Sequence, residues 1–298
     1  MIFNKCKKRI LSRKTKQIIF LSFSKTLSSE TFHANSTYMP IINSINKVIG
    51  KEDYNLIVSD VGVDEKPPPS LLRNDVDGII FHGFMSYVFY EKYIKHLPHV
   101  GIQHYDPRLK CNWVMTDQWS IAFKSVEYLY GLGHRKISFL SDMSENDIAQ
   151  ERYCGYKDGL KYFNLPFNKG LIQRWQRPRI NGVIPPETEL PNYIPQITNL
   201  MNLENSPTAI ICLGDSRALA VSRALEKIGY SIPEDVSVVG ANNKDSQFGF
   251  TGACSNLYTV CKDAAQLILK LINGKHVPFR KIMIQPNFYI GTSTKAIN

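Results

Sequence analysis

Asp215 and Asn242 are polar residues that could contact a small molecule, because each follows an apolar run of strand length. The two runs cover residues 208–213 and 236–239, and both have the composition of buried strands. Between them, apolar residues recur at intervals of three and four, which predicts a helix that Asp215 or Ser216 could cap. Ligands of open α/β sheets bind beyond the carboxyl ends of the strands. We therefore expect Asp215 and Asn242 to face one crevice.

The rest of the sequence alternates in the same way between short apolar runs and helical patterns. Strands are expected at residues 17–23, 54–59, 77–81, 100–102, 113–116, 137–140, 171–175, 282–284 and 288–290. Helices are expected at residues 37–51, 121–130, 148–163, 192–203 and 260–271. This alternation predicts an α/β fold with parallel sheets.

The stretch at residues 207–243, PTAIICLGDSRALAVSRALEKIGYSIPEDVSVVGANN, resembles the effector-binding region of LacI/GalR-type transcription regulators. Further matching segments are Asp-Gly-Ile-Ile at 77–80, Gly-Leu-Gly-His-Arg-Lys-Ile at 131–137, Arg152 with Gly155-Tyr156, Leu-Ile-Asn-Gly at 271–274 and Thr-Ser-Thr at 292–294. Together they extend the resemblance over about residues 17–294. The resemblance does not include the helix-turn-helix domain that the family carries ahead of its first strand.

The resemblance implies the fold of periplasmic binding proteins of type I, in which two similar Rossmann-like lobes are joined by three crossover segments. On this basis the N-terminal lobe would comprise residues 17–133 and 255–275. The C-terminal lobe would comprise residues 134–254 and 276–298. Residues 1–16 would be a basic arm, similar to the tail of the linker that follows the family's DNA-binding domain.

The resemblance also implies roles for individual residues. In the family, the arginine three residues before Gly-Tyr reaches the bound effector, and Arg152 has this position. A guanidinium is a fixed fork of donors suited to two hydroxyls or a carboxylate. Asn242 stands where most members have an Asp that binds a sugar. Gly214 replaces the Asn of sugar-binding members and matches the purine-binding branch, so the ligand class stays open between a sugar and a purine.

Aromatic and imidazole side chains complete the predicted ligand site. Trp119 and Trp175 each follow the expected end of a strand, and their faces suit sugar or base rings. Asn35 and Tyr38 would close the site on the N-terminal lobe. His104 also follows a strand end and could donate or accept a hydrogen bond. For each of these residues a purely structural role remains the alternative.

Motifs for catalysis or for metal and cofactor binding were not found. The sequence has no GxSxG, Walker, GxGxxG or HExxH pattern in the required context. The six cysteines form no CxxC pair and show no zinc spacing, which indicates reduced thiols in a cytoplasmic protein. We expect no enzyme activity, no metal and no cofactor.

Positive charge is concentrated at the start of the sequence. The net charge is +10, and residues 1–16 contain seven basic side chains and no acidic one, which leaves 29 basic against 26 acidic residues elsewhere. Such an arm could contact nucleic acid phosphates or could simply be solvated. No apolar run approaches the length of a membrane span.

These observations predict the effector-sensing domain of a LacI/GalR-like regulator, which binds a small polar metabolite, in the first place a sugar, between two lobes. A homodimer is implied, with DNA bound only through a domain absent from this chain. The alternative is a stand-alone solute-binding protein without DNA binding.

Overall fold

The structure is a computed structural model that describes residues 14–23, 38–62, 64–142, 147–175, 192–212, 214–240 and 249–297. It divides into two compact units. Unit 1 runs to Met115 and includes Leu257–Ile284, whereas unit 2 comprises Thr116–Asn256 and Gln285–Asn298. Each unit is an α/β sandwich built on a six-stranded sheet among the described residues. The predicted α/β class with largely parallel sheets is confirmed.

The sheet of unit 1 has the strand order β11-β5-β4-β3-β1-β2. Its strands are β1 (Gln17–Phe23), β2 (Asn55–Asp60), β3 (Gly78–Gly83), β4 (His99–Ile102), β5 (Asn112–Thr116) and β11 (Lys281–Ile284). Strand β1 pairs in parallel with both β2 and β3. Its run Ile-Ile-Phe-Leu is buried throughout, because the sheet is covered on both faces.

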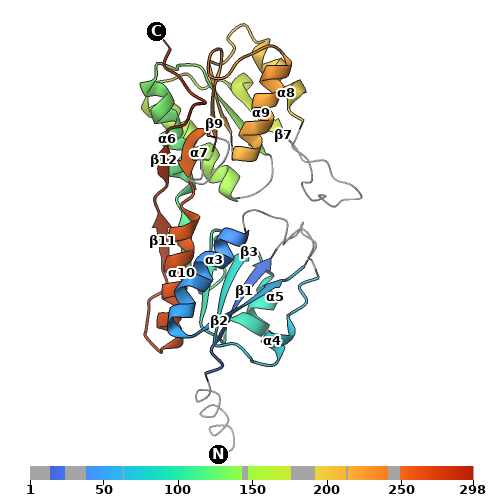
Figure 1. Cartoon of the computed structure of the whole chain (residues 1–298), viewed down its shortest axis with the longest axis vertical. Helices are drawn as coiled ribbons and strands as arrows, with labels where there is room; N and C mark the ends of the chain where they lie inside the picture. The colour runs from blue at the N-terminus through green and yellow to red at the C-terminus, as the bar shows by residue number, and fades with distance from the viewer. Residues whose placement is uncertain are drawn as a thin grey trace, which may run out of the picture. The chain divides into compact units, whose positions relative to one another are not determined.

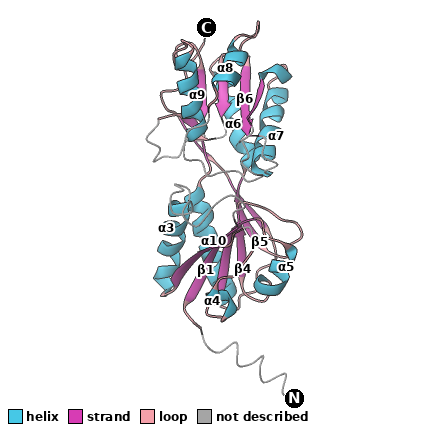
Figure 2. Ribbon diagram, turned by 90° about the vertical axis from the view of Figure 1, so that its right-hand side faces the viewer, coloured by secondary structure: helices cyan, strands magenta, loops and turns pink. Residues whose placement is uncertain are grey.

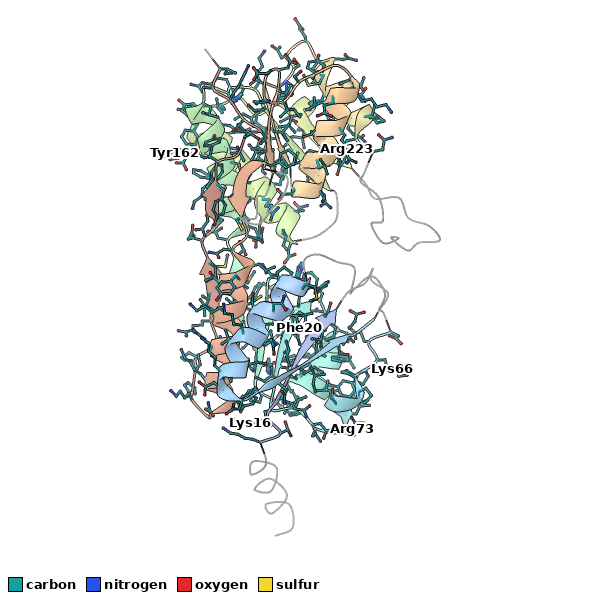
Figure 3. The ribbon with its side chains drawn as sticks, viewed as in Figure 1. Lys16, Phe20, Lys66, Arg73, Tyr162 and Arg223 are labelled. Atoms are coloured by element: carbon teal, nitrogen blue, oxygen red, sulfur yellow. The ribbon has the colours of Figure 1, made fainter. Side chains whose placement is uncertain are left out.

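Successive residues of β1 enter different cores of unit 1. Ile18 and Phe20 pack with α3 (Tyr38–Ile49) and α10 (Leu257–Ile272). Ile19 and Leu21 point to the other face, which is covered by α4 (Pro69–Leu72), α5 (Tyr87–Phe89) and the following π-helical turn Tyr90–Ile94. Figure 2 shows α3 and α10 on one side of this sheet and α5 on the other. Phe20 is labelled within this unit in Figure 3.

Unit 2 repeats this architecture with the strand order β12-β10-β9-β8-β6-β7. Its strands are β6 (Ile137–Asp142), β7 (Ile172–Trp175), β8 (Ala209–Cys212), β9 (Ser237–Gly240), β10 (Thr251–Cys254) and β12 (Asn287–Tyr289). Strand β12 is antiparallel to β10, whereas β7, β6, β8, β9 and β10 pair in parallel with their neighbours in this order.

Two helix pairs cover the two faces of this sheet. One face carries α8 (Ile194–Met201) and α9 (Asp215–Lys227), and the other carries α6 (Gln118–Gly131) and α7 (Asp147–Tyr162). Figure 1 and Figure 2 show both pairs beside the strands of unit 2. In the core between the sheet and the α6–α7 pair, the rings of Phe139 and Tyr156 stack with their centroids 4.9 Å apart.

The boundaries of the two units differ from the expected lobes. Helix α6 belongs to unit 2 and β11 to unit 1, so the chain changes unit after Met115 rather than near residue 133, and after Ile284 rather than near residue 275. Packing explains the first difference. Ala122, Val126 and Leu129 of α6 join the core that contains Tyr156 and Leu160 of α7.

Only the end of the predicted basic arm lies within the described residues. The backbone N–H groups of Thr15 and Lys16 donate to the Asp77 carboxylate at 2.8 and 3.0 Å, and Lys14 Nζ donates to Asn273 at 2.6 Å. These bonds join the residues before β1 to unit 1. Among the described helices, none is long and apolar enough to cross a membrane.

Candidate functional site

Arg152 is the central residue of the candidate site in unit 2. It lies in the second turn of α7 and is 8% exposed. Its Nε atom donates to Oε1 of Gln118, the first residue of α6, at 2.8 Å. Burial, and after it the positive charge of Arg217, together lower the pKa of the guanidinium to about 10. The group remains charged at neutral pH.

Two glycines on α7 allow Gln118 to reach Arg152. A Cβ atom on Gly155 would lie 2.1 Å from the carbonyl oxygen of Trp119, and one on Gly159 would lie 2.9 Å from Cβ of Val126. Glycine at both positions, four residues apart, therefore lets α6 and α7 approach closely along one face. Sequence reasoning used Gly155 only as part of a motif and missed Gln118.

The start of α6 is fixed independently of Arg152. The Asp117 carboxylate accepts from the backbone N–H of Ser120 at 2.9 Å and from the Ser120 hydroxyl at 2.6 Å. Gln285 donates to the same carboxylate at 2.8 Å. Gln118 is therefore presented by a capped, well-anchored helix end.

Asp215 lies at the carboxyl end of the neighbouring strands, as predicted. It is the first residue of α9, and its Oδ1 lies close to Gly240 at the end of β9, where an added Cβ would be only 2.7 Å away. It does not cap its helix as expected: the cap position is Gly214, without a side-chain hydrogen bond. The carboxylate is instead turned toward the strand ends.

Arg217 was not singled out from the sequence, but it lies at the same edge. A Cβ atom on Gly214 would be 3.9 Å from its Nη1, so the guanidinium turns back over the start of α9. Its charge also influences the Cys212 thiol at the end of β8, whose pKa is raised by burial. The signal available in the sequence was a cation two residues after Asp215.

Trp119 occupies a different place from the one predicted for it. Its Nε1 donates to Asp158 at 2.7 Å, and its ring stacks on Phe123 at 4.7 Å between centroids. Phe123 also contacts Tyr162 and Phe163. Tyr162 is 71% exposed, and Figure 3 shows it at the outer edge of unit 2. The structure therefore groups Trp119 with a surface aromatic cluster rather than with Arg152.

In unit 1 the structure links two predicted residues, Tyr38 and His104, through a third, His82. The His82 ring lies 5.7 Å from the Tyr38 ring and 4.9 Å from the His104 ring, measured between centroids. Phe84 lies 5.0 Å from His104. His82 is the penultimate residue of β3, so strand position alone could have indicated it.

Ser22 and Asp60 extend this cluster across the sheet. Ser22 is in register with both Asp60 of β2 and His82 of β3. The Ser22 hydroxyl donates to the Tyr38 oxygen at 2.9 Å. Burial raises the pKa of Asp60 and also that of Tyr38. Unit 1 therefore presents hydroxyl, carboxyl and imidazole groups at the carboxyl ends of its strands.

The remaining predicted site residues are not described. Asn35 and Asn242 lie outside the described residues, and only the backbone of Trp175 is described, at the end of β7. Within the part of the chain that the structure describes, no group of three His, Cys, Asp or Glu side chains could hold a metal ion.

Comparison with known proteins assigns the family. Residues 126–294 match the sequence profile of the periplasmic binding protein-like domain. The chain belongs to this family. It is 24% identical over 286 residues to the HTH-type transcriptional repressor PurR of Vibrio campbellii, a match that covers 90% of this chain and 80% of that protein.

Solved structures agree with this assignment. A LacI-family regulatory protein from Chloroflexus aggregans aligns with a TM-score of 0.78 at 21% identity, covering 94% of this chain and 99% of that one. A LacI-family regulator from Enterococcus faecium with bound ribose aligns with a TM-score of 0.75 at 18% identity, covering 94% and 100%. The resemblance to LacI/GalR-type effector-binding domains that the sequence indicated is confirmed.

Proposed function

We propose that this periplasmic binding protein-like domain senses a small polar metabolite for a cytoplasmic, homodimeric transcription regulator. The ligand would bind between the carboxyl edges of the two sheets, with Arg152 as the principal contact. The single observation that supports this most is the buried guanidinium of Arg152, held by Gln118 at 2.8 Å at such an edge. Buried, oriented fork donors are suited to polar ligands with paired oxygens.

Ligand binding would act by differential affinity for two arrangements of the units, because a ligand shifts an equilibrium only by that difference. DNA binding is assigned in this proposal to a helix-turn-helix domain of the kind named in the PurR relative. The relatives are repressors, which favours a regulator over the alternative of a stand-alone solute-binding protein. The bound ribose of the Enterococcus faecium structure favours a sugar as the first class to test.

The test is calorimetry and thermal unfolding with pentoses, hexoses, their acids and phosphates, nucleosides and purines. A ligand present at about 100 times its dissociation constant should stabilise the folded chain by about 2.7 kcal/mol. Arg152→Ala should abolish this stabilisation. Arg223→Ala should leave it unchanged, since Arg223 is an exposed arginine of α9. Binding that survives Arg152→Ala, or no binding to the folded chain by any compound, would overturn the proposal.

A further inference from the structure

Arg217 gives the candidate site a second guanidinium beside that of Arg152. The two residues come from α9 and α7, on opposite faces of the sheet of unit 2. Arg217 turns back toward Gly214, immediately beyond the end of β8, and its Nε atom is buried. Strand β8 pairs with β6, the strand that precedes α7. Both arginines are thus directed to one stretch of the carboxyl edge.

The charge of Arg217 is close enough to Arg152 to affect its pKa. After burial, the charge of Arg217 is the second cause that lowers the pKa of Arg152. Like charges in a partly buried setting repel, and their interaction is stronger there than in water. Asp215, close to Gly240, adds one negative charge to the described side chains of this edge. The three side chains together carry a net charge of +1.

We propose that the ligand of this site carries an oxyanion, a carboxylate or a phosphate, which Arg152 and Arg217 bind together. This inference rests on the proposed function and narrows its ligand class from neutral sugars and bases to acidic metabolites. An oxyanion bound between two guanidiniums accepts charge-assisted hydrogen bonds from both, and its negative charge reduces their mutual repulsion. Arg217 is then the residue that selects the anion, whereas Arg152 contributes to binding in general.

Matched ligand pairs test this inference by calorimetry. Ribose is compared with ribose 5-phosphate, and glucose with gluconate and glucose 6-phosphate; inorganic phosphate serves as the minimal probe. The native chain should bind the anionic members at least about ten-fold more tightly than the neutral ones, the ratio that about 1.4 kcal/mol produces. Carboxylate and phosphate members distinguish the two sources of the oxyanion.

Variants separate this inference from the proposed function. Arg217→Met should weaken binding of the anionic members about ten-fold or more, with less effect on neutral ones, and Arg217→Lys should restore part of the loss. Arg223→Met removes one charge from the exposed side of α9 and should change the affinity for neither the anionic nor the neutral ligands. Neutral ligands that bind best, with an affinity that depends on Arg152 but not on Arg217, would overturn the inference and leave the proposed function standing. Absence of any binding by the folded chain would overturn both.

Discussion

The Nε atom of Arg152 lies 2.8 Å from Oε1 of Gln118, so a buried charge in one helix is oriented by the first residue of another. The pair connects α7 to the start of α6 within unit 2. A guanidinium loses conformational freedom when it is ordered, and an existing hydrogen bond means that part of this loss occurs before a ligand arrives. Gln118 is therefore a positioning residue for Arg152.

Replacing Gln118 with Leu should destabilise the chain, because it removes the acceptor from a buried, charged donor. We expect a loss of about 1–3 kcal/mol in the free energy of unfolding, measured by urea denaturation. The affinity for any ligand that depends on Arg152 should also fall. Gln118→Glu keeps an acceptor and should retain stability. Equal stability of Gln118→Leu and the native chain would contradict this role.

Gly155→Ala should disrupt the contact between α6 and α7. The new methyl group would lie 2.1 Å from the Trp119 carbonyl oxygen, a backbone atom that cannot move without shifting α6. We expect destabilisation by several kcal/mol, in the range of severe overpacking. The matched control is Gly131→Ala, at the end of α6, where nothing lies within 4 Å. The control should be neutral or slightly stabilising; similar effects of both substitutions would refute the explanation.

His134 should make stability depend on pH. Its ring is buried between the Thr208 hydroxyl, 2.8 Å from Nδ1, and the Lys295 carbonyl, 3.1 Å from Nε2. Burial lowers its pKa below the usual value of 6.5, so the unfolded chain binds the proton more tightly. The stability that the neutral, buried His134 contributes is fully present above about pH 6.5, and it is lost as the pH falls from there through the lower pKa of the folded state. His99, whose pKa is also lowered by burial, adds a parallel effect in unit 1.

The measurement is the free energy of unfolding at pH 7.5, 6.5 and 5.5. The native chain should lose stability as the pH falls from 7.5 to 5.5. In the His134→Gln variant, which keeps His99, the free energy of unfolding should depend less steeply on pH. A slope unchanged by the substitution would show that His134 does not titrate in this range.

The cysteines should differ sharply in reactivity. Cys154 is exposed on α7, whereas Cys111, Cys212 and Cys261 are buried and their thiol pKa values are raised by burial. The thiolate is the reactive form, so a maleimide or disulfide reagent should modify Cys154 under native conditions, whereas Cys111, Cys212 and Cys261 should react only on unfolding. Peptide mapping after brief labelling tests this. Rapid modification of Cys212 in the folded chain would contradict it.

Much of the fold could be predicted because its strands are buried on both faces. A continuous apolar run such as Ile18–Leu21 in β1 leaves few alternatives to a central parallel strand. The predicted helices at 37–51 and 148–163 correspond to α3 and α7 within two residues at each end. By contrast, β10 was missed: Thr-Gly-Ala-Cys is short and lacks branched apolar residues, and its burial is decided by its neighbours β9 and β12.

The candidate site was less accessible to sequence reasoning. Tyr38 and His104 were predicted separately, but only the register of β1 with β3 shows that His82 lies between them. Gln118 and Arg217 were missed for a similar reason, since their partners are 34 and 65 residues away in the sequence. Trp119 was predicted in the site but lies outside it. Adjacent residues of a helix point in different directions, so Gln118 faces Arg152 whereas Trp119 binds Asp158.

Helix α10 has a consequence for the order in which the protein can be completed during synthesis. It packs with α3 in the core of unit 1, yet it is encoded after almost all of unit 2. A nascent chain that has emerged only to Asn256 holds the strands β1 to β5 and α3, but lacks α10, the second helix that packs on Ile18 and Phe20. The part of this core that α10 covers therefore stays available to chaperones until α10 emerges late in synthesis. Unit 2 is complete at that stage except for β12 and the residues after it. The unit that begins first in the sequence is therefore completed at almost the same time as the unit that begins second.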